Sequence, residues 1–253
     1  MWGFERMKTL GQTARLAGLT AALLALAACD TAEFGRGLGP QARGDQSLAN
    51  FQSRLDRNPS DVASLVGIGD VHARRADWSR ASGAYREALI VNAGSREAQI
   101  GYSVAQSALG DYSAAVAHAN KAVDTRADTE ALIAAAVALN GQGQHAAAKQ
   151  VLEQALALNP RDLDVRNNLA LTLALMGDRQ AYAMQHAVAF APDSDFRHHR
   201  NFFLVAAMLG MEQAAQKDAA VLNLTSQEVE QITAIGRQAR SRGMAAFGIT
   251  AKT

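Results

Sequence analysis

Residues 143–177 read GQHAAAKQVLEQALALNPRDLDVRNNLALTLALMG, and this stretch decides the fold. A glycine stands at each end, and two helix-type segments lie between them on either side of Asn159-Pro160. The same turn signal recurs at intervals of 34, 33, 34 and 33 residues, in the triplets Ala76-Asp77-Trp78, Gly110-Asp111-Tyr112, Gly143-Gln144-His145, Gly177-Asp178-Arg179 and Gly210-Met211-Glu212. A period of about 34 residues is typical of stacked helix–turn–helix units. The sequence therefore predicts a solenoid, a class of fold that holds partners far more often than it performs chemistry.

Composition agrees with a helical array and narrows the classes of function. The chain has 253 residues, of which 49% are hydrophobic and 6% aromatic, with four prolines, as suits tightly packed helices. A formal charge of +1 gives no reason to expect a nucleic-acid partner. A compact helical bundle without repeats is the alternative fold, but it does not account for four intervals that agree within one residue.

The first 28 residues are predicted to be an export signal. Basic residues at positions 6, 8 and 15 precede a mostly apolar run over 16–28, which is too short to span a bilayer core of about 30 Å as a helix. The run ends in Leu26-Ala27-Ala28-Cys29, which resembles a bacterial lipobox. The resemblance implies that Cys29 carries a diacylglycerol, as in palmitate-bearing lipoproteins, and becomes the mature N-terminus. A signal without lipid and a buried structural cysteine are the alternatives.

Residues 29–44 are predicted to be a lipidated flexible tether, because four glycines and a proline stand among few apolar residues. Asp30 follows the cysteine and resembles an inner-membrane retention signal of enterobacterial lipoproteins. We therefore expect a lipoprotein of the bacterial cell envelope that faces the periplasm, on the outer or the inner membrane. Met1 and Met7 both remain candidate starts.

The repeats closely resemble the tetratricopeptide family, whose pattern is W-x2-L-G-x2-Y, then A-x3-F, then P. Leu65, Ile68, Gly69 and His72 occupy the first four of these places in the first repeat. The resemblance implies an all-α, right-handed superhelical solenoid with repeats at 62–95, 96–128, 129–162 and 163–195. The short spacing after Gly177 indicates a shortened second helix in the fourth repeat.

The ends of the array depart from the repeat. Residues 196–224 are predicted to be a degenerate fifth repeat, and 45–61 an N-terminal capping helix. Thr225 with Glu228 resembles a capping box that opens a C-terminal capping helix at 225–243, before a tail at 244–253.

Motifs of catalysis and of metal binding are lacking. The sequence has no glycine-rich phosphate loop, HExxH or GxSxG motif. His198 and His199 are adjacent, and adjacent helical residues point about 100° apart, which makes a poor chelating pair. We expect no enzyme activity, no metal or other cofactor and no small-molecule substrate.

In tetratricopeptide arrays the first helix of each repeat lines a concave groove. The resemblance and the repeat phase place Ala63 there with the predicted peptide-binding residues Val66, Asp70, Ile100, Val104, Ile133, Val137, Asn140, Asn167, Leu171, Arg197, Arg200 and Leu204. The apolar middle suits an extended or helical peptide, and an acidic group could meet the two arginines at the irregular C-terminal end. The alternative is that some of these apolar residues pack between repeats.

The stretch DVRNNLALTLALMG, residues 164–177, is similar to the TadD family of tetratricopeptide lipoproteins, which accompany tight-adherence (Flp) pilus systems. The resemblance implies a membrane-anchored scaffold, or pilotin-like protein, that binds protein components of the pilus secretion apparatus, with a secretin among the candidates. Two alternatives stay open. One is a general envelope adaptor, such as a secretin pilotin or a scaffold for peptidoglycan enzymes. The other is an enzyme with a repeat accessory region, for which no segment outside the array is long enough.

Overall fold

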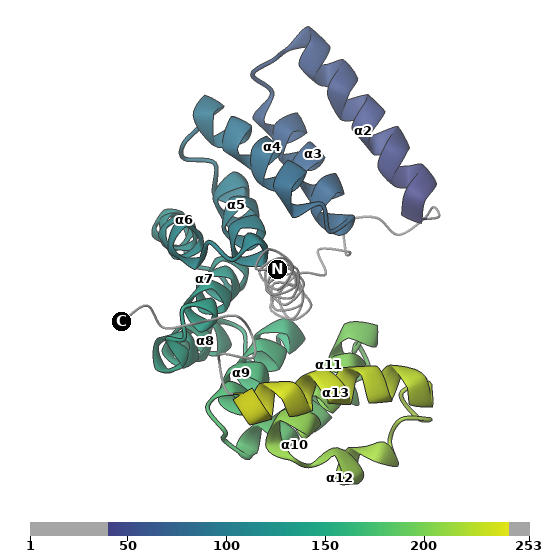
Figure 1. Cartoon of the computed structure of the whole chain (residues 1–253). Helices are drawn as coiled ribbons and strands as arrows, with labels where there is room; N and C mark the ends of the chain where they lie inside the picture. The colour runs from purple at the N-terminus through teal and green to yellow at the C-terminus, as the bar shows by residue number, and fades with distance from the viewer. Residues whose placement is uncertain (1–39, 243–253) are drawn as a thin grey trace, which may run out of the picture.

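The computed structural model describes residues 40–242, which form twelve α-helices and no strand (Figure 1). The predicted signal at 1–28, the lipidation site Cys29 and the tail at 244–253 lie outside the described residues. The predicted all-α solenoid is confirmed. Its first helices are α3 (Val62–Arg74), α5 (Arg96–Leu109), α7 (Thr129–Gly141), α9 (Leu163–Leu175) and α11 (Phe196–Leu209), and its second helices are α4 (Trp78–Val91), α6 (Tyr112–Thr125), α8 (His145–Leu158) and α10 (Gln180–Ala189).

The turns between paired helices follow directly from the recurring signal in the sequence. Each of its first residues has a positive φ: 55° at Ala76, 84° at Gly110, 76° at Gly143, and 74° at both Gly177 and Gly210. Glycine is the residue that adopts this left-handed conformation without steric cost, so it ends a helix cleanly. The 34-residue interval in the sequence is therefore the interval between helix ends.

The first helices also begin on a regular interval. The residues that cap their N-termini are Asp61, Ser95, Asp128, Asp162 and Asp195, and each side chain accepts a hydrogen bond from a backbone N–H in the first turn. Such caps satisfy donors that have no partner within the helix. Short polar residues thus fix where every first helix starts.

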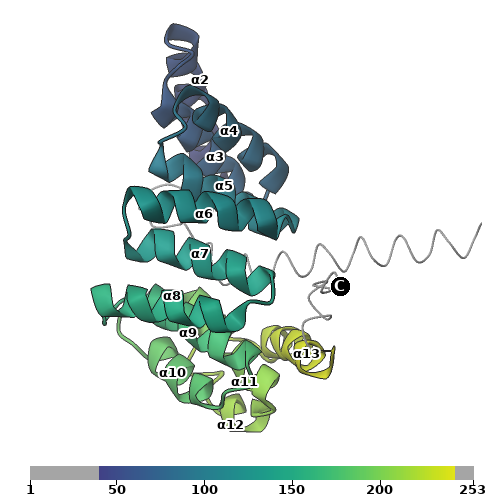
Figure 2. The ribbon, with the colours of Figure 1, turned by 90° about the vertical axis from the view of Figure 1, so that its left-hand side faces the viewer.

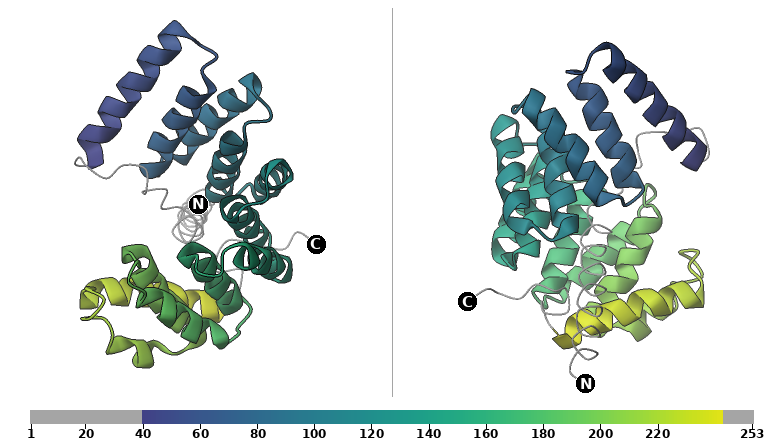
Figure 3. Two further views of the ribbon diagram at one scale, coloured as in Figure 1. Left: turned by 180° about the vertical axis from the view of Figure 1, so that it is seen from behind. Right: turned by 45° about the horizontal axis from the view of Figure 1, so that its top comes forward.

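The array is curved, with the first helices on its concave side (Figures 1 and 3). Each first helix contacts the next one, from α3 through α5, α7 and α9 to α11. The second helices form the convex side, where Figure 2 shows the units stacked from α2 to α12. This arrangement brings one stripe of every first helix onto a common surface.

The N-terminal end differs from the sequence-based prediction. Helix α2 (Pro40–Arg57) begins within the predicted tether at 29–44, five residues before the expected capping helix at 45–61. Proline suits the first helical position because its missing N–H would be unpaired there in any case. Phe51 of α2 packs against Gly67 of α3, where there is room for the ring only because glycine has no side chain.

The C-terminal end is irregular. Helix α10 has 10 residues, whereas α8 has 14, and the fifth repeat has only the five-residue α12 (Glu212–Gln216) in its second half. Helix α13 (Ser226–Arg242) packs along α11, with Gly236 against Ala207 and the backbone of Leu204. The hydroxyl of Thr225 accepts from the Glu228 N–H, and the Glu228 carboxylate accepts from the Thr225 N–H, which is the capping-box pattern.

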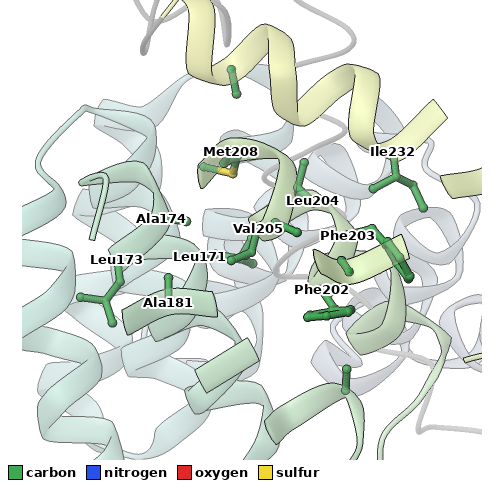
Figure 4. Packing of buried hydrophobic residues seen from close by; sticks show 14 of the residues in the cluster. Leu171, Leu173, Ala174, Ala181, Phe202, Phe203, Leu204, Val205, Met208 and Ile232 are labelled. Atoms are coloured by element: carbon green, nitrogen blue, oxygen red, sulfur yellow. The ribbon is translucent and has the colours of Figure 1, made fainter. Parts of the chain in front are cut away.

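The largest buried cluster lies at this irregular end (Figure 4). Phe202 and Phe203 are fully buried there, together with Val205, and Ile232 of α13 covers the same cluster. The N-terminal repeats have smaller clusters built around alanines, such as Ala81 and Ala105 with Tyr85. The cluster also includes Ala136, Ala148 and Leu152 of the regular third repeat, so it extends from that repeat to the C-terminal helix α13.

Candidate protein-binding face

The predicted groove residues form rows along the concave side. The first row is Val66, Ile100, Ile133, Asn167 and Arg200, and the second is Asp70, Val104, Val137, Leu171 and Leu204. Successive members of each row are 33 or 34 positions apart and belong to successive first helices. We call the side of the first helices that carries these two rows the inner face.

The N-terminal half of the inner face is accessible. Val66, Val104 and Ile133 are half-buried, on α3, α5 and α7 respectively. Ile100 lies between them and is 7% exposed. All three side chains pack partly against buried clusters. Their remaining exposed surface lies on three neighbouring helices, as expected of a face that docks a peptide.

In the C-terminal half of the inner face, the apolar residues of the second row are not accessible. Val137, Leu171 and Leu204 are buried, and the last two belong to the large core cluster. For these residues the alternative reading is correct: they pack between repeats. The backbone of Leu204 contacts Gly236 of α13, and Leu171 packs in the same core cluster as Leu204.

The two asparagines predicted to line the groove are structural. Asn167 is 0% exposed, and its Oδ1 accepts hydrogen bonds from Gln185 Nε2 at 2.9 Å and Asn201 Nδ2 at 3.0 Å. Asn140 is 5% exposed and donates to Thr172 Oγ1 at 2.8 Å. Buried amides need such partners, so neither side chain has surface to offer to a ligand.

Arg197 is held within the protein. Its guanidinium lies 2.8 Å from Asp164 and 3.1 Å from Asp195, and its side chain is 13% exposed. The neighbouring His198, whose Nε2 lies 3.3 Å from Asp164 Oδ1, holds the pKa of that carboxyl below its ordinary value together with Arg197, although burial acts in the opposite direction. Arg197 and Arg200 therefore do not form the predicted pair of groove arginines, because Arg197 forms an ion pair that links α11 to α9.

Arg200 lies in a different environment. It is half-buried, and its guanidinium carbon lies 5.8 Å from the centre of the Phe196 ring, a cation–π arrangement. Phe196 is 50% exposed. Of the two arginines predicted to meet an acidic group, only Arg200 has this partly open setting.

A set of carboxylates borders the accessible half of the inner face. Arg96, which is 9% exposed, pairs with Asp128, with Glu130 at 3.2 Å and with Glu97 at 3.8 Å. The side chains of Glu97 and Glu130 are 66% and 65% exposed. Arg126 also pairs with Asp128, at 2.8 Å, so two cations face three acidic groups and the border carries net negative charge.

Asp70 is the most unusual of the predicted residues. It is half-buried, and Tyr85 Oη donates a hydrogen bond to its Oδ1 at 2.7 Å. Tyr85 is itself 3% exposed and comes from the outer helix α4. The sequence places Asp70 on the inner face but gives no signal for this bond, because its partner lies 15 residues away on another helix.

The histidines contribute to packing and capping. His198 Nδ1 accepts from the Asp195 N–H at 3.1 Å, and His199 Nε2 lies 3.1 Å from Ser194 Oγ. Within residues 40–242, no group of three or more His, Cys, Asp or Glu residues could hold a metal ion.

No helix in this part of the chain is long and apolar enough to cross a membrane.

Comparison with known proteins identifies the type of repeat. A tetratricopeptide-repeat family model matches residues 129–172, which include α7 and α8. No curated protein matches the chain.

Solved structures match a much larger part of the chain. A tetratricopeptide repeat protein from Parabacteroides merdae is 16% identical, with a TM-score of 0.64, and the match covers 78% of this chain and 79% of that one. A chain of the APC/C hetero-tetramer Cut9-Hcn1 is 15% identical, with a TM-score of 0.62, and the match covers 83% of this chain and 44% of that one. YrrB, described as a TPR protein with an unusual peptide-binding site, is 18% identical over 72% of this chain and 96% of its own, with a TM-score of 0.47. The first two likenesses show that the fold is a tetratricopeptide-repeat solenoid.

Proposed function

We propose that this tetratricopeptide-repeat solenoid is a lipid-anchored scaffold that binds protein components of the Flp pilus apparatus on the N-terminal half of its inner face. The observation that carries the proposal is the accessible apolar surface of Val66, Val104 and Ile133 on three adjoining helices. The fold suggests a scaffold for protein–protein interaction, and the inner face supplies a surface for it. No reaction is part of the proposal.

Rigid helices favour binding at such a face. Each first helix is capped at its N-terminus and packed against the next one, so its side chains are held before a partner arrives. Association then loses less conformational entropy than it would on a mobile loop. A docked segment would contact α3, α5 and α7 together, which selects for an extended or helical polypeptide rather than a small molecule.

The proposed anchor lies close to the array in the sequence. Pro40, where α2 begins, is eleven positions after the Cys29 lipidation site. A fully extended chain of that length reaches at most about 40 Å. A lipid on Cys29 would therefore keep the inner face near the membrane surface, where a secretion apparatus is assembled.

The pilus assignment depends on the combination of features rather than on a single site. The TadD-like stretch, residues 164–177, forms most of α9 and ends at the following turn, and Val165, Leu169 and Ala170 in it are buried. Such residues are needed by any closely packed repeat. Support for the assignment therefore comes from the lipobox, the short linking segment, the array and the trailing helix together.

Comparative pull-downs in the native bacterium test the proposal. Full-length protein is compared with Cys29→Ser, with Val104→Gln and with Gln154→Ala, which alters an exposed position on the second helix α8. We expect wild type and Gln154→Ala to recover pilus-apparatus proteins in quantitative mass spectrometry, and Val104→Gln to lose them. We expect Cys29→Ser to lose labelling by an alkynyl fatty acid and to leave the membrane fraction.

Each part of the proposal can fail separately. Equal recovery by Val104→Gln and wild type would exclude the inner face as the binding surface. Membrane association of Cys29→Ser, with no fatty-acid label on wild type, would exclude the anchor. Recovery of peptidoglycan enzymes or other envelope proteins, without pilus components, would favour the general adaptor.

A further inference from the structure

The second row of the inner face contains one charged residue. Val104, Val137, Leu171 and Leu204 occupy the row in α5, α7, α9 and α11, and Asp70 occupies it in α3. A carboxylate thus stands where four other units place a branched apolar side chain. Packing between repeats does not require it, because the equivalent residues are all apolar.

The surrounding structure holds this carboxylate in place. The Tyr85 ring passes from α4 between the two inner helices α3 and α5, where it contacts Gly69 and Gly101. A Cβ atom on Gly69 would lie 2.5 Å from the ring, and a Cβ atom on Gly101 would also collide with it. Two glycines therefore make room for a phenol whose hydroxyl ends at Asp70 Oδ1 on the inner face.

The charge on Asp70 is only partly compensated. Burial raises the pKa of its carboxyl, and the nearby Glu130 carboxylate acts in the same direction. The Tyr85 hydroxyl and the Arg74 charge oppose this rise but do not cancel it. A cation placed next to Asp70 would stabilise the ionised form that burial disfavours.

We propose that the N-terminal half of the inner face binds a polypeptide segment that carries a lysine or arginine between apolar side chains. The basic group pairs with Asp70, and the apolar side chains contact Val66, Val104 and Ile133. Charge complementarity selects this occupant, since the acidic border of Glu97 and Glu130 repels an acidic peptide. The inference depends on the proposed function, because it specifies the chemistry of the partner at the same face.

A peptide selection tests the inference. Phage-displayed random 16-residue peptides are selected on the full-length protein in detergent micelles, and the enriched peptides are synthesised. Their dissociation constants are measured with wild type, Asp70→Asn, Val104→Gln and Glu87→Gln. The last variant removes one negative charge from an exposed position on α4 and serves as the matched control. Circular dichroism and the Tm check that each variant is folded.

The expected result is a shared lysine or arginine flanked by apolar residues, with binding to Asp70→Asn weakened about tenfold or more. Glu87→Gln should bind as wild type does. Tyr85→Phe should raise the pKa of Asp70 further, as followed by NMR titration of the carboxyl carbon, and weaken binding less than Asp70→Asn does.

Several results would overturn the inference. They are enriched peptides without a common basic residue, no enrichment at all, or equal binding by Asp70→Asn and wild type. If Val104→Gln still weakens binding in the last case, the inner face remains the binding surface and only the basic anchor is wrong. If Val104→Gln has no effect either, the proposed binding face fails as well.

Discussion

Asn201 Nδ2 donates a hydrogen bond to Asn167 Oδ1 over 3.0 Å, and the two residues are 34 positions apart, one repeat length. Gln185 Nε2 donates to the same oxygen from the second helix α10. One buried carbonyl group therefore joins α9, α10 and α11 at the irregular end of the array. Asn167, which the sequence placed among the predicted peptide-binding residues, is instead a buried hydrogen-bond acceptor within the fold.

Loss of this junction should destabilise the protein. Asn167→Ala leaves the amides of Gln185 and Asn201 without their shared acceptor inside the core. We expect the free energy of unfolding to fall by about 2–4 kcal/mol, as measured by urea denaturation. Asn120→Ala, at an exposed position of α6, should change it by less than about 0.5 kcal/mol. An equally small effect of Asn167→Ala would show that the junction is not structural.

The turn residues should respond to substitution according to the sign of φ. Gly143 has φ of 76°, so Gly143→Ala should lower the free energy of unfolding by about 1 kcal/mol. Ala76 already has a positive φ, of 55°. Ala76→Gly should therefore raise the free energy of unfolding by about 0.5 kcal/mol. Gly83, in the middle of α4, is a control with equally open space around its Cβ position, and Gly83→Ala should stabilise by about 0.5–1 kcal/mol. The same sign for both glycine-to-alanine changes would contradict this account of the turns.

The docking of α13 should depend on Gly236. A Cβ atom there would lie 2.5 Å from Ala207 Cβ and 2.8 Å from the Leu204 carbonyl oxygen, and the backbone cannot yield as a flexible side chain does. We expect Gly236→Ala to destabilise by about 1–3 kcal/mol and to increase hydrogen exchange selectively in α13 and α11. Gln231→Ala, at an exposed position of α13, should leave exchange unchanged. Uniform loss of protection along the chain would argue against a local effect.

Asp164 should make stability depend on pH in the acid range. His198 Nε2 lies 3.3 Å and the Arg197 guanidinium 2.8 Å from its Oδ1, and these two groups lower its folded-state pKa from the ordinary 3.8 although burial acts in the opposite direction. A lowered folded-state pKa contributes stability that is present above 3.8 and is lost as pH falls through the folded-state value. Asp164→Asn should therefore destabilise the protein at pH 7, and the difference from wild type should shrink below pH 3.8 in denaturation series. A difference that is constant down to pH 2 would refute this.

The sequence predicted the features that local chemistry controls. The recurring turn residues determine where the first helices end, and the spacing after Gly177 indicated the shortened α10. The start of α2 at Pro40 was missed, because glycines in the predicted tether were read as flexibility. Proline at a first helical position was the available signal.

The degree of burial of each side chain on the inner face could not be predicted in the same way. Periodicity identifies the inner side of each first helix, but it does not distinguish half-buried Val104 from buried Leu204. Leu204 lies on α11, along which α13 packs, and its backbone contacts Gly236 of that helix. Asn167 and Arg197 were misread as ligand contacts because their partners Gln185 and Asp164 lie on other helices.

Photo-cross-linking in cells at two equivalent positions tests the central claim most directly. Val66 and Arg200 belong to the same row of the inner face, at its two ends, and both are half-buried. A photoreactive amino acid is introduced at each position in turn, and adducts are identified by mass spectrometry. The account predicts adducts with a pilus-apparatus protein from position 66 and none above background from position 200. Adducts from position 200 alone would contradict the account, because they would show that the binding site lies at the C-terminal end of the inner face.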